Sequence, residues 1–407
     1  MLGWEFPPFF AGGAGIVCYE MAKALTEKGH EVTYIMPFGP KNVSSDAAKL
    51  IVADQILPGL RIQVVDSLLT AYVTSEEYRQ QYDLLRNLNG GTLGKDVTLA
   101  LYGRNLFEEI IRFALRARVI AASQSFDVIH AQDWTTFPAA VAIKKASGKP
   151  LVVHVHNTVF DRYLNSGNST EYSFEKAGME AADLVIAISH YVKNRIVDNY
   201  GIPAYKVRVV HNATPCMQGI SFENKLQERV VLFAGRVTIQ KGPDYFVEAA
   251  RRVLEKDPKV RFVMAGSGDM LPQVMQRVAE LGLLDKFWFT GFYNREEAEK
   301  LFSMASVCVM PSVSEPFGVI PLESLAKDTP VIISKQSGVS EVLQNALKVD
   351  FWDTEDMANK ILAILHYKSL HRTLQVFGKQ EAQQLTWDKV ADKLISVYDE
   401  VVPKQLA

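Results

Sequence analysis

Short runs of apolar residues alternate with amphipathic stretches along almost the whole chain. In the first half, the runs that predict buried strands follow an opening MLGWEF and lie at 31–36, 127–131, 151–155, 183–188 and 207–210. The stretches with helical spacing of apolar residues lie at 15–29, 97–124, 136–147 and 171–181. Continuous Val- and Ile-rich strands separated by helices are typical of parallel sheets covered on both faces.

The second half repeats this alternation. Its predicted strands lie at 230–234, 261–265, 287–290, 307–310 and 330–333. Its predicted helices lie at 243–256, 270–281, 295–304, 319–327 and 354–366, followed by an amphipathic stretch at 386–403. The polar segment 212–228 separates the two series. We therefore predict an α/β protein with two Rossmann-like domains, 1–212 and 222–385, whose ligands bind at the carboxyl ends of the strands.

Composition narrows the class of protein. The chain has 407 residues and a net charge of −2, which argues against a nucleic-acid binder. Cys18, Cys216 and Cys308 are too few and too scattered for a disulfide framework or a zinc site, so we expect a reducing, cytoplasmic environment. The start lacks the basic end of a signal peptide, and no apolar run is long enough to span a membrane. The opening strand is short for its place, which leaves open whether residues precede Met1.

The most informative local pattern is PSVSEPFGVIPLE at 311–323, where a strand leads into a loop and then a short helix. The backbone N–H groups from Phe317 to Ile320, with Gly318 and Val319 between them, would lie at the start of that helix and favour a phosphate. Glu315 and Glu323 flank this position and could accept hydrogen bonds from sugar hydroxyls. The alternative is a capped helix with two solvated glutamates.

A second pattern, GRVTIQKG at 235–242, directly follows a predicted strand. It would place Arg236 and Lys241 at the carboxyl end of that strand, where two cations can balance a diphosphate leaving group. The alternative is a pair of surface cations.

Two glycine-rich loops also follow strands. AGGAG at 11–15 contains Gly12 and Gly13, and AGSGD at 265–269 contains Gly268. Glycine allows the backbone to approach a ligand closely, and a simple tight turn is the alternative. The AGSGD loop taken alone is only weak evidence for a ligand site. AGGAG lacks the GxGxxG spacing of a dinucleotide-binding loop.

Histidines mark the carboxyl end of the first-half strands. In LVVHVHNT, at 151–158, His154 and His156 share a face, and His156 is the better placed to reach a ligand. In HAQDW, Asp133 follows the neighbouring predicted strand and would face the same ligand-binding cleft as His156. We expect His130 and His154 to belong to the core, and a structural role is the alternative for His156 as well. The chain contains no D-x-D, GxxxxGK[ST] or G-x-S-x-G pattern, so it indicates neither a metal-bridged sugar nucleotide of the D-x-D kind nor a P-loop enzyme or α/β-hydrolase.

Together these segments resemble the family 4 retaining glycosyltransferases of the GT-B fold, in particular the glycogen- and starch-synthase-like members. The resemblance covers essentially the whole chain. It rests most specifically on E-P-F-G-x-x-x-x-E and GRxxxxKG, and also on WEFPPFFAGGAG, DVIHAQDW and GMEAADLVIAISHYVKN.

The resemblance implies a sugar nucleotide, UDP- or ADP-glucose, held between the two domains and transferred with retention to an α-glucan without a metal. By resemblance, Arg236 and Lys241 bind the diphosphate, Glu315 contacts the donor sugar, Glu323 holds the ribose and His156 lies beside the 6-hydroxyl. The implied donor contacts also include Gly12, Gly13, Gly268, Phe317, Gly318 and Val319, and the implied sugar or acceptor contacts are Asp133 and Asn157. The segment 386–403 is expected to pack back on the first domain.

The chain departs from the synthases at several positions. Gln132 replaces the second His of H-x-H-D-W, Asn157 replaces an Asp, residues 9–11 replace a lysine-containing approach to the glycine loop, and 327–329 lie where a glycine is frequent. A family 4 transferase with a lipid-linked, sugar-phosphate or small-molecule acceptor is therefore an alternative, and a sugar-nucleotide epimerase is another. The oligomeric state stays open.

Overall fold

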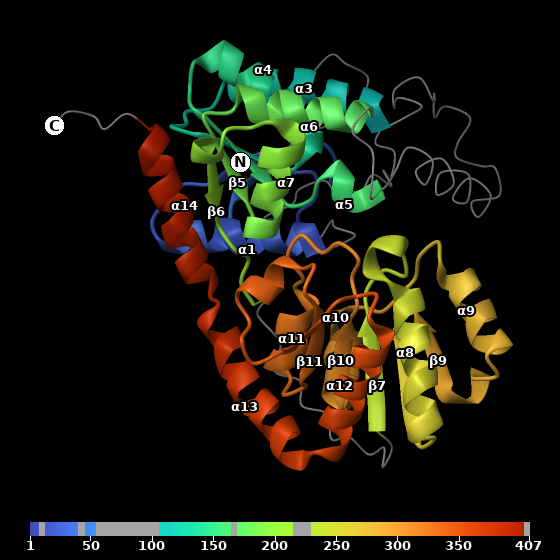
Figure 1. Ribbon diagram of the computed structural model, residues 1–407. Helices are drawn as coiled ribbons and strands as arrows, with labels where there is room; N and C mark the ends of the chain where they lie inside the picture. Colours follow the sequence, from blue (N-terminus) through green and yellow to red (C-terminus); the bar gives the residue numbers. More distant parts are fainter. Residues whose placement is uncertain (8–12, 40–44, 54–105, 164–168, 215–228, 403–407) are drawn as a thin grey trace.

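The computed structural model of the chain describes residues 1–7, 13–39, 45–53, 106–163, 169–214 and 229–402 (Figure 1). It contains two α/β units, one from each half of the chain, and each is built on parallel strands covered by helices. The predicted α/β fold is confirmed. The predicted linker 212–228 lies largely outside the described residues, so the proposed domain limits 1–212 and 222–385 stay a prediction.

The first-half sheet has the strand order β3-β4-β5-β6, and every neighbouring pair is parallel. Its strands are β3 (Ile129–Gln132), β4 (Leu151–Val155), β5 (Leu184–Ala187) and β6 (Val207–Val209). A parallel pair, β1 (Thr33–Met36) and β2 (Lys49–Val52), is joined to this sheet by Leu2, which bridges Ile35 on one side and Ala131 on the other. The helices are α1 (Gly13–Glu27), α3 (Leu106–Ala121), α4 (Phe137–Ser147), α5 (Val159–Tyr163), α6 (Thr170–Ala181) and α7 (His190–Tyr200).

The predicted opening strand is reduced to this bridge at Leu2 among the segments the structure describes. A side chain at Gly3 would place its Cβ 1.4 Å from the Tyr34 hydroxyl, and that hydroxyl donates to the Glu5 carbonyl. The Tyr34 side chain thus holds the backbone close at this point, and residues 4 and 5 continue to the end of the sheet where β3 and β4 finish.

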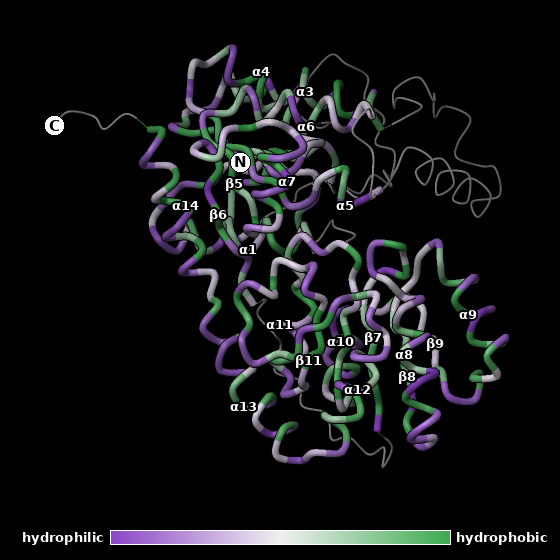
Figure 2. Tube along the Cα trace, in the orientation of Figure 1, coloured by the Kyte–Doolittle hydropathy of each residue, from purple (hydrophilic) through white to green (hydrophobic). Residues whose placement is uncertain are grey.

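The second-half sheet has the order β12-β11-β10-β7-β8-β9, again parallel throughout. Its strands are β7 (Arg229–Ala234), β8 (Val260–Ala265), β9 (Phe287–Gly291), β10 (Val307–Met310), β11 (Val331–Ser334) and β12 (Leu347–Val349). Its helices are α8 (Pro243–Lys256), α9 (Leu271–Glu280), α10 (Arg295–Met304), α11 (Ile320–Ala326) and α12 (Thr354–His366). In Figure 2 the strands are mostly hydrophobic, whereas the covering helices mix hydrophobic and hydrophilic residues.

Two helices end the described chain, α13 (Lys368–Gln384) and α14 (Trp387–Val401). The Thr386 side chain caps α14 by accepting from the Lys389 backbone N–H. Leu394 and Val390 of α14 share a buried core with Val17 and Met21 of α1, so the last helix lies against the first half (Figure 1). This packing buries the apolar stripe that the sequence shows at 386–403.

The predicted elements match the observed ones within two residues at each end, except for the opening strand and for 97–124, of which 97–105 lies outside the described residues. Five observed elements, β2, β12, α5, α7 and α13, were not predicted from the sequence. The strands are short, and α13 buries only Leu374, Gly378 and Ala382. The signal for α7 was present, because Val192, Ile196 and Tyr200 are spaced by four and are all buried.

Candidate active site

Three loops of the second half meet at the carboxyl ends of β7, β8 and β10. The Val237 N–H donates to the Ser267 carbonyl at 2.9 Å, which ties the loop after β7 to the loop after β8. The Val313 N–H donates to the Gln240 carbonyl at 2.9 Å, which ties the first loop to the loop after β10. The backbone therefore fixes the segments GRVTIQKG, AGSGD and PSVSEPFG as one surface.

Glycines permit this close approach. A Cβ on Gly268 would lie 2.3 Å from the Val237 carbonyl oxygen, and one on Gly242 would lie 2.3 Å from the Pro311 carbonyl oxygen. Gly242 also has a φ of +63°, which side chains rarely adopt. The predicted residue Gly268 thus serves the packing of the loops, whatever it contacts in a ligand.

Lys241 and Glu315 form an ion pair on this surface. The Lys241 Nζ lies 2.5 Å from Glu315 Oε2, and the Ser312 hydroxyl donates to the same oxygen at 3.0 Å. Glu315 is only 6% exposed, so these donors offset the cost of burying its charge. Arg236 lies on the same loop, where its guanidinium donates to Gln240 Oε1 at 3.3 Å. The structure therefore pairs Lys241 with the predicted sugar-binding carboxylate and places Arg236 on the loop that carries Lys241.

The loop after Glu315 leads into α11. Gly318 has a φ of +100°, and Phe317 is buried, with its carbonyl accepting from the Val339 N–H at 2.7 Å. Val319 is the N-cap of α11 and makes no side-chain capping bond, so the helix starts without a side-chain acceptor. This start agrees with the predicted helix at 319–327 to within one residue.

Glu323 lies in the first turn of α11 and is half-buried. Burial raises the pKa of its carboxyl to about 7, the nearby Glu299 adds to this rise, and Arg295 opposes it. Near neutral pH the Glu323 carboxyl, the predicted ribose contact, is therefore protonated in part of the molecules and ionised in the rest.

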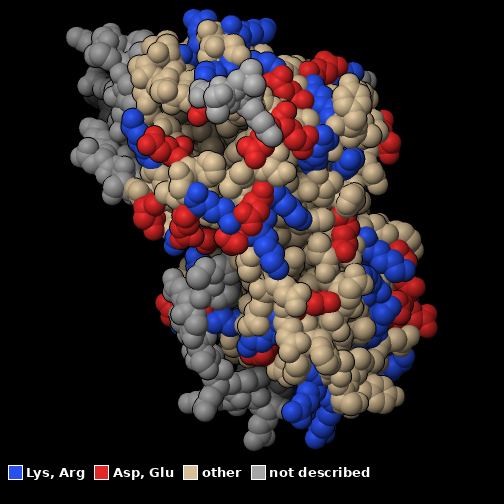
Figure 3. Space-filling model, turned by 90° about the vertical axis from the view of Figure 1, so that its left-hand side faces the viewer, with Lys and Arg blue, Asp and Glu red and all other residues tan. Residues whose placement is uncertain are grey.

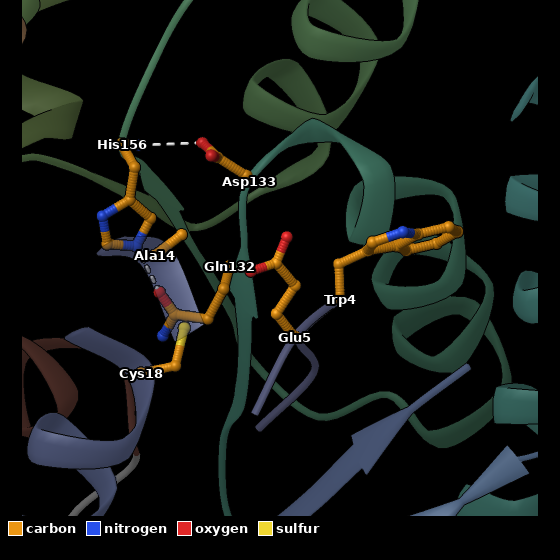
Figure 4. A pocket seen from close by; sticks show the side chains of 7 residues that line it. All are labelled: Trp4, Glu5, Ala14, Cys18, Gln132, Asp133 and His156. Atoms are coloured by element: carbon orange, nitrogen blue, oxygen red, sulfur yellow. Dashed lines mark hydrogen bonds between the residues drawn. The ribbon is translucent and has the colours of Figure 1, made fainter. Parts of the chain in front are cut away.

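The first half contributes a strained aspartate beside a histidine. Asp133 follows β3 with φ 61° and ψ 165°, a conformation that belongs almost entirely to glycine. Its Oδ1 accepts from the backbone N–H of His156 at 2.8 Å and of Asn157 at 3.3 Å, directly after β4. The strained backbone thus places the Asp133 carboxylate, at the end of β3, against the residues at the end of β4. Figure 4 shows Asp133 turned toward His156.

Figure 4 shows the pocket that His156 and Asp133 line. Five further residues complete its wall, Trp4, Glu5, Ala14, Cys18 and Gln132. Burial lowers the pKa of His156 to about 4, so the imidazole is neutral at physiological pH. Trp4, Glu5 and Gln132 were not predicted as site residues, although the segments WEFPPFFAGGAG and DVIHAQDW that contain them carry part of the family resemblance.

The two halves touch beside the Glu315 loop. The Ser314 hydroxyl donates to Asp161 Oδ1 at 2.6 Å, and the Tyr191 and Ser314 hydroxyls lie 3.0 Å apart. The Ser189 hydroxyl donates to the Pro316 carbonyl at 2.6 Å. The residues on either side of Glu315 are therefore anchored to the first half. On the face in Figure 3, basic and acidic side chains lie interspersed and no field of one sign covers it.

Other predicted features have the following places. Gly12 lies outside the described residues, and Gly13 is the first residue of α1. His130 and His154 are buried, as expected. Within the described ranges, no three His, Cys, Asp or Glu side chains gather so that they could hold a metal ion. None of the described helices is both long and apolar enough to cross a membrane.

Sequence profiles match almost the whole chain. The profile of Glycosyltransferase Family 4 matches residues 11–216, and that of Glycosyl transferases group 1 matches residues 220–381. An uncharacterized glycosyltransferase of Methanocaldococcus jannaschii is 26% identical over 98% of this chain and 97% of its own. A glycogen synthase of Mycobacterium tuberculosis is 24% identical over 98% of this chain and 93% of its own.

Solved structures show the same fold. Sucrose-phosphate synthase from Thermosynechococcus elongatus has a TM-score of 0.72 and 21% identity, covering 96% of this chain and 94% of its own. HepE from Anabaena in complex with UDP has a TM-score of 0.65 and 16% identity, covering 98% of each chain. With these matches and the site described above, the chain belongs to the family 4 glycosyltransferases of the GT-B fold.

Proposed function

We propose that this enzyme transfers glucose from a nucleoside diphosphate glucose, UDP- or ADP-glucose, to an α-glucan, with retention of configuration and without a metal. The observation that carries the proposal is the cradle in which Lys241, Arg236 and Glu315 meet at the carboxyl ends of β7 and β10. The relatives named glycogen synthase and HepE with UDP support a nucleotide-sugar donor.

The charges of the cradle suit a diphosphate sugar. The Lys241 ammonium has three donors, so it can keep its bond to Glu315 and still donate to a phosphate. Glu315 repels phosphate but accepts hydrogen bonds from sugar hydroxyls. The uncapped start of α11 adds oriented N–H groups on the same side.

In the proposed reaction, the bond between the anomeric carbon and the diphosphate oxygen breaks while the acceptor oxygen bonds to that carbon from the same face. The acceptor proton passes to the departing phosphate oxygen. Arg236 and Lys241 stabilise the charge that grows on the diphosphate, so no protein nucleophile is required. His156 and the pocket of the first half would face the sugar from the opposite side of the cleft.

Donor and acceptor profiling tests the proposal. The enzyme is incubated with UDP-, ADP- and GDP-sugars, with and without glycogen, and nucleotide release is measured in the presence and absence of EDTA. We expect glycogen-dependent release with one glucosyl donor, unaffected by EDTA, and an α-linked product by NMR. Release that needs no acceptor, or loss of activity with EDTA, would contradict the proposal.

A sugar phosphate is the second candidate acceptor, because one structural neighbour is named sucrose-phosphate synthase. The assay therefore includes fructose 6-phosphate and inositol phosphate in place of glycogen. Transfer to these acceptors but not to glycogen would replace the α-glucan assignment and leave the transferase chemistry intact.

A further inference from the structure

A chain of buried hydrogen bonds connects the pocket histidine to the last helix. His156 Nε2 lies 2.7 Å from Gln132 Oε1, and Gln132 Nε2 lies 3.2 Å from His130 Nε2. His130 Nδ1 lies 2.7 Å from the Tyr398 hydroxyl on α14. Four side chains, from β3, the end of β4 and α14, thus form a continuous path, which we call the Gln132 relay. Figure 4 shows its Gln132 and His156 members.

The amide of Gln132 determines where the protons lie. Its oxygen can only accept, so His156 donates from Nε2–H and keeps the lone pair on Nδ1. Its nitrogen can only donate, and it lies nearer to His130 Nε2 (3.2 Å) than to His130 Nδ1 (3.5 Å). We therefore assign the lone pair of His130 to Nε2, which leaves Nδ1–H to donate to the Tyr398 oxygen. One residue therefore selects the tautomer of two histidines.

His154 is compatible with this assignment. Its Nδ1 lies 3.3 Å from His130 Nε2, so with His130 assigned in this way His154 donates from Nδ1–H and shares that acceptor with the Gln132 amide. Its Nε2 then carries a lone pair, and this atom has no hydrogen-bond partner among the described residues. A buried lone pair without a partner is easier to tolerate than a buried N–H in the same state, so the arrangement is self-consistent.

Burial keeps the relay neutral. His130, His154 and His156 are 1%, 0% and 5% exposed, and their rings stack at centroid distances of 5.3 and 4.4 Å. A charged imidazole would be desolvated and would repel its neighbours, so burial lowers the pKa of each histidine. The histidines of the relay are therefore neutral, and the hydrogen bonds determine only which ring nitrogen carries the proton.

We propose that Gln132 is a positioning residue that, with Tyr398 behind it, fixes His156 as the Nε2–H tautomer and presents the Nδ1 lone pair to a hydroxyl of the reacting hexose. The assignment of the hydroxyl rests on the proposed function, whereas the tautomer does not. This replacement of a histidine in the family segment H-x-H-D-W thus has a specific consequence: an amide selects one tautomer, where a second imidazole could adopt either.

The tautomer is measured first, on the ligand-free wild-type protein, by two-bond ¹H–¹⁵N NMR of the histidine ring nitrogens. We expect His156 and His130 as opposite tautomers, Nε2–H and Nδ1–H. Tyr398→Phe should shift the His130 resonances, and the matched change Tyr200→Phe should leave them in place, because the Tyr200 hydroxyl bonds Glu175 outside the relay. His156 as the Nδ1–H tautomer would overturn the proposal, independently of any substrate.

The second arm uses Gln132→Glu, which keeps the acceptor for His156 but adds a charge that favours the imidazolium. The titratable groups around the ring are Asp133, Glu5, Cys18 and the two other histidines, and they are the same in both proteins. We expect a new acidic limb in kcat, about tenfold down at pH 6 and recovering at pH 9, with the donor KM within twofold. The surface control Gln383→Glu should keep the wild-type profile. A folded Gln132→Glu protein whose pH profile is unchanged would overturn the positioning role.

Discussion

The two halves of the chain present different polar groups on similar α/β scaffolds. The second half gathers a charged set, Lys241, Arg236 and Glu315, on loops tied together by backbone hydrogen bonds. The first half presents the neutral imidazole of His156, which is hydrogen-bonded to the Gln132 amide, while the Asp133 carboxylate accepts from the His156 backbone N–H. Charge on one side suits the proposed diphosphate, and neutral hydrogen bonding on the other suits the hydroxyls of a sugar.

The halves also differ in how they use strained backbone. Asp133 and Asp328 are the non-glycine residues with positive φ in the described chain, one in each half. The Asp133 carboxylate bonds two backbone N–H groups at the site. Asp328 lies in the turn before β11, and its carboxylate pairs with Lys379 on the surface. Strain at the first position therefore supports the site, whereas strain at the second only connects a helix to a strand.

The largest effect is expected from Lys241→Ala. It removes the cation from the buried Glu315 and from the proposed leaving group, so kcat/KM should fall at least about 100-fold, the scale of losing one preorganised transition-state donor. Nucleotide-release kinetics measure this loss. Lys335→Ala, which removes an exposed lysine paired with Asp350, is the matched control and should stay near wild type. Near wild-type transfer by a folded Lys241→Ala protein would show that the charged residues of the second half do not act on the leaving group.

Asp133→Gly should separate strain from function. Glycine adopts the observed φ and ψ freely, but it removes the acceptor of the His156 N–H. Transfer should fall about tenfold or more, because hydrogen bonds to a charged group are worth about 1.5–3 kcal/mol. Asp133→Asn keeps an acceptor oxygen and should lose less. If the glycine variant transfers glucose as well as wild type, the carboxylate has no role in holding His156.

Glu323→Gln tests the half-buried carboxyl of the second half, whose pKa is raised. The folded pKa of Glu323 is raised from 4.5 to about 7, so its contribution to stability is present at low pH and is lost as pH rises through 7. The glutamine variant has no such titration. The free energy of unfolding of the variant relative to wild type should therefore increase between pH 5 and pH 8, as measured by urea denaturation. A difference that does not vary with pH would show that the carboxyl is not perturbed.

The smallest effect is expected at Asp328. Asp328→Gly relieves the left-handed conformation and loses an exposed ion pair, and these opposing changes should leave the free energy of unfolding within about 0.5 kcal/mol of wild type. Asp328→Val should cost about 1–2 kcal/mol, because a β-branched residue does not tolerate this φ. Transfer should be unchanged in both variants. A loss of transfer in Asp328→Gly would give this turn a role like that of Asp133.

Some elements and contacts of this protein could be predicted from the sequence and others could not. The strands and helices of both halves were predictable because buried parallel strands are continuously apolar and the helices between them are amphipathic. Short or polar elements such as β12 and α13 were not, because little of their surface is buried locally. The prediction that Arg236, Lys241 and Glu315 converge followed from their positions after parallel strands. The pairing of Lys241 with Glu315 did not, since it depends on the loop after β10 folding back on the loop after β7.

The sequence by itself therefore determined the α/β class, the two series of strands and the family, because hydrophobic periodicity and short loop motifs are local properties. Only the tertiary structure decided which polar groups meet. Gln132 selects a tautomer because β3 and β4 are neighbours in register and because α14 returns to place Tyr398 beside His130. Such partners are separated by up to 268 residues, and no spacing along the chain encodes a distance that is set by packing.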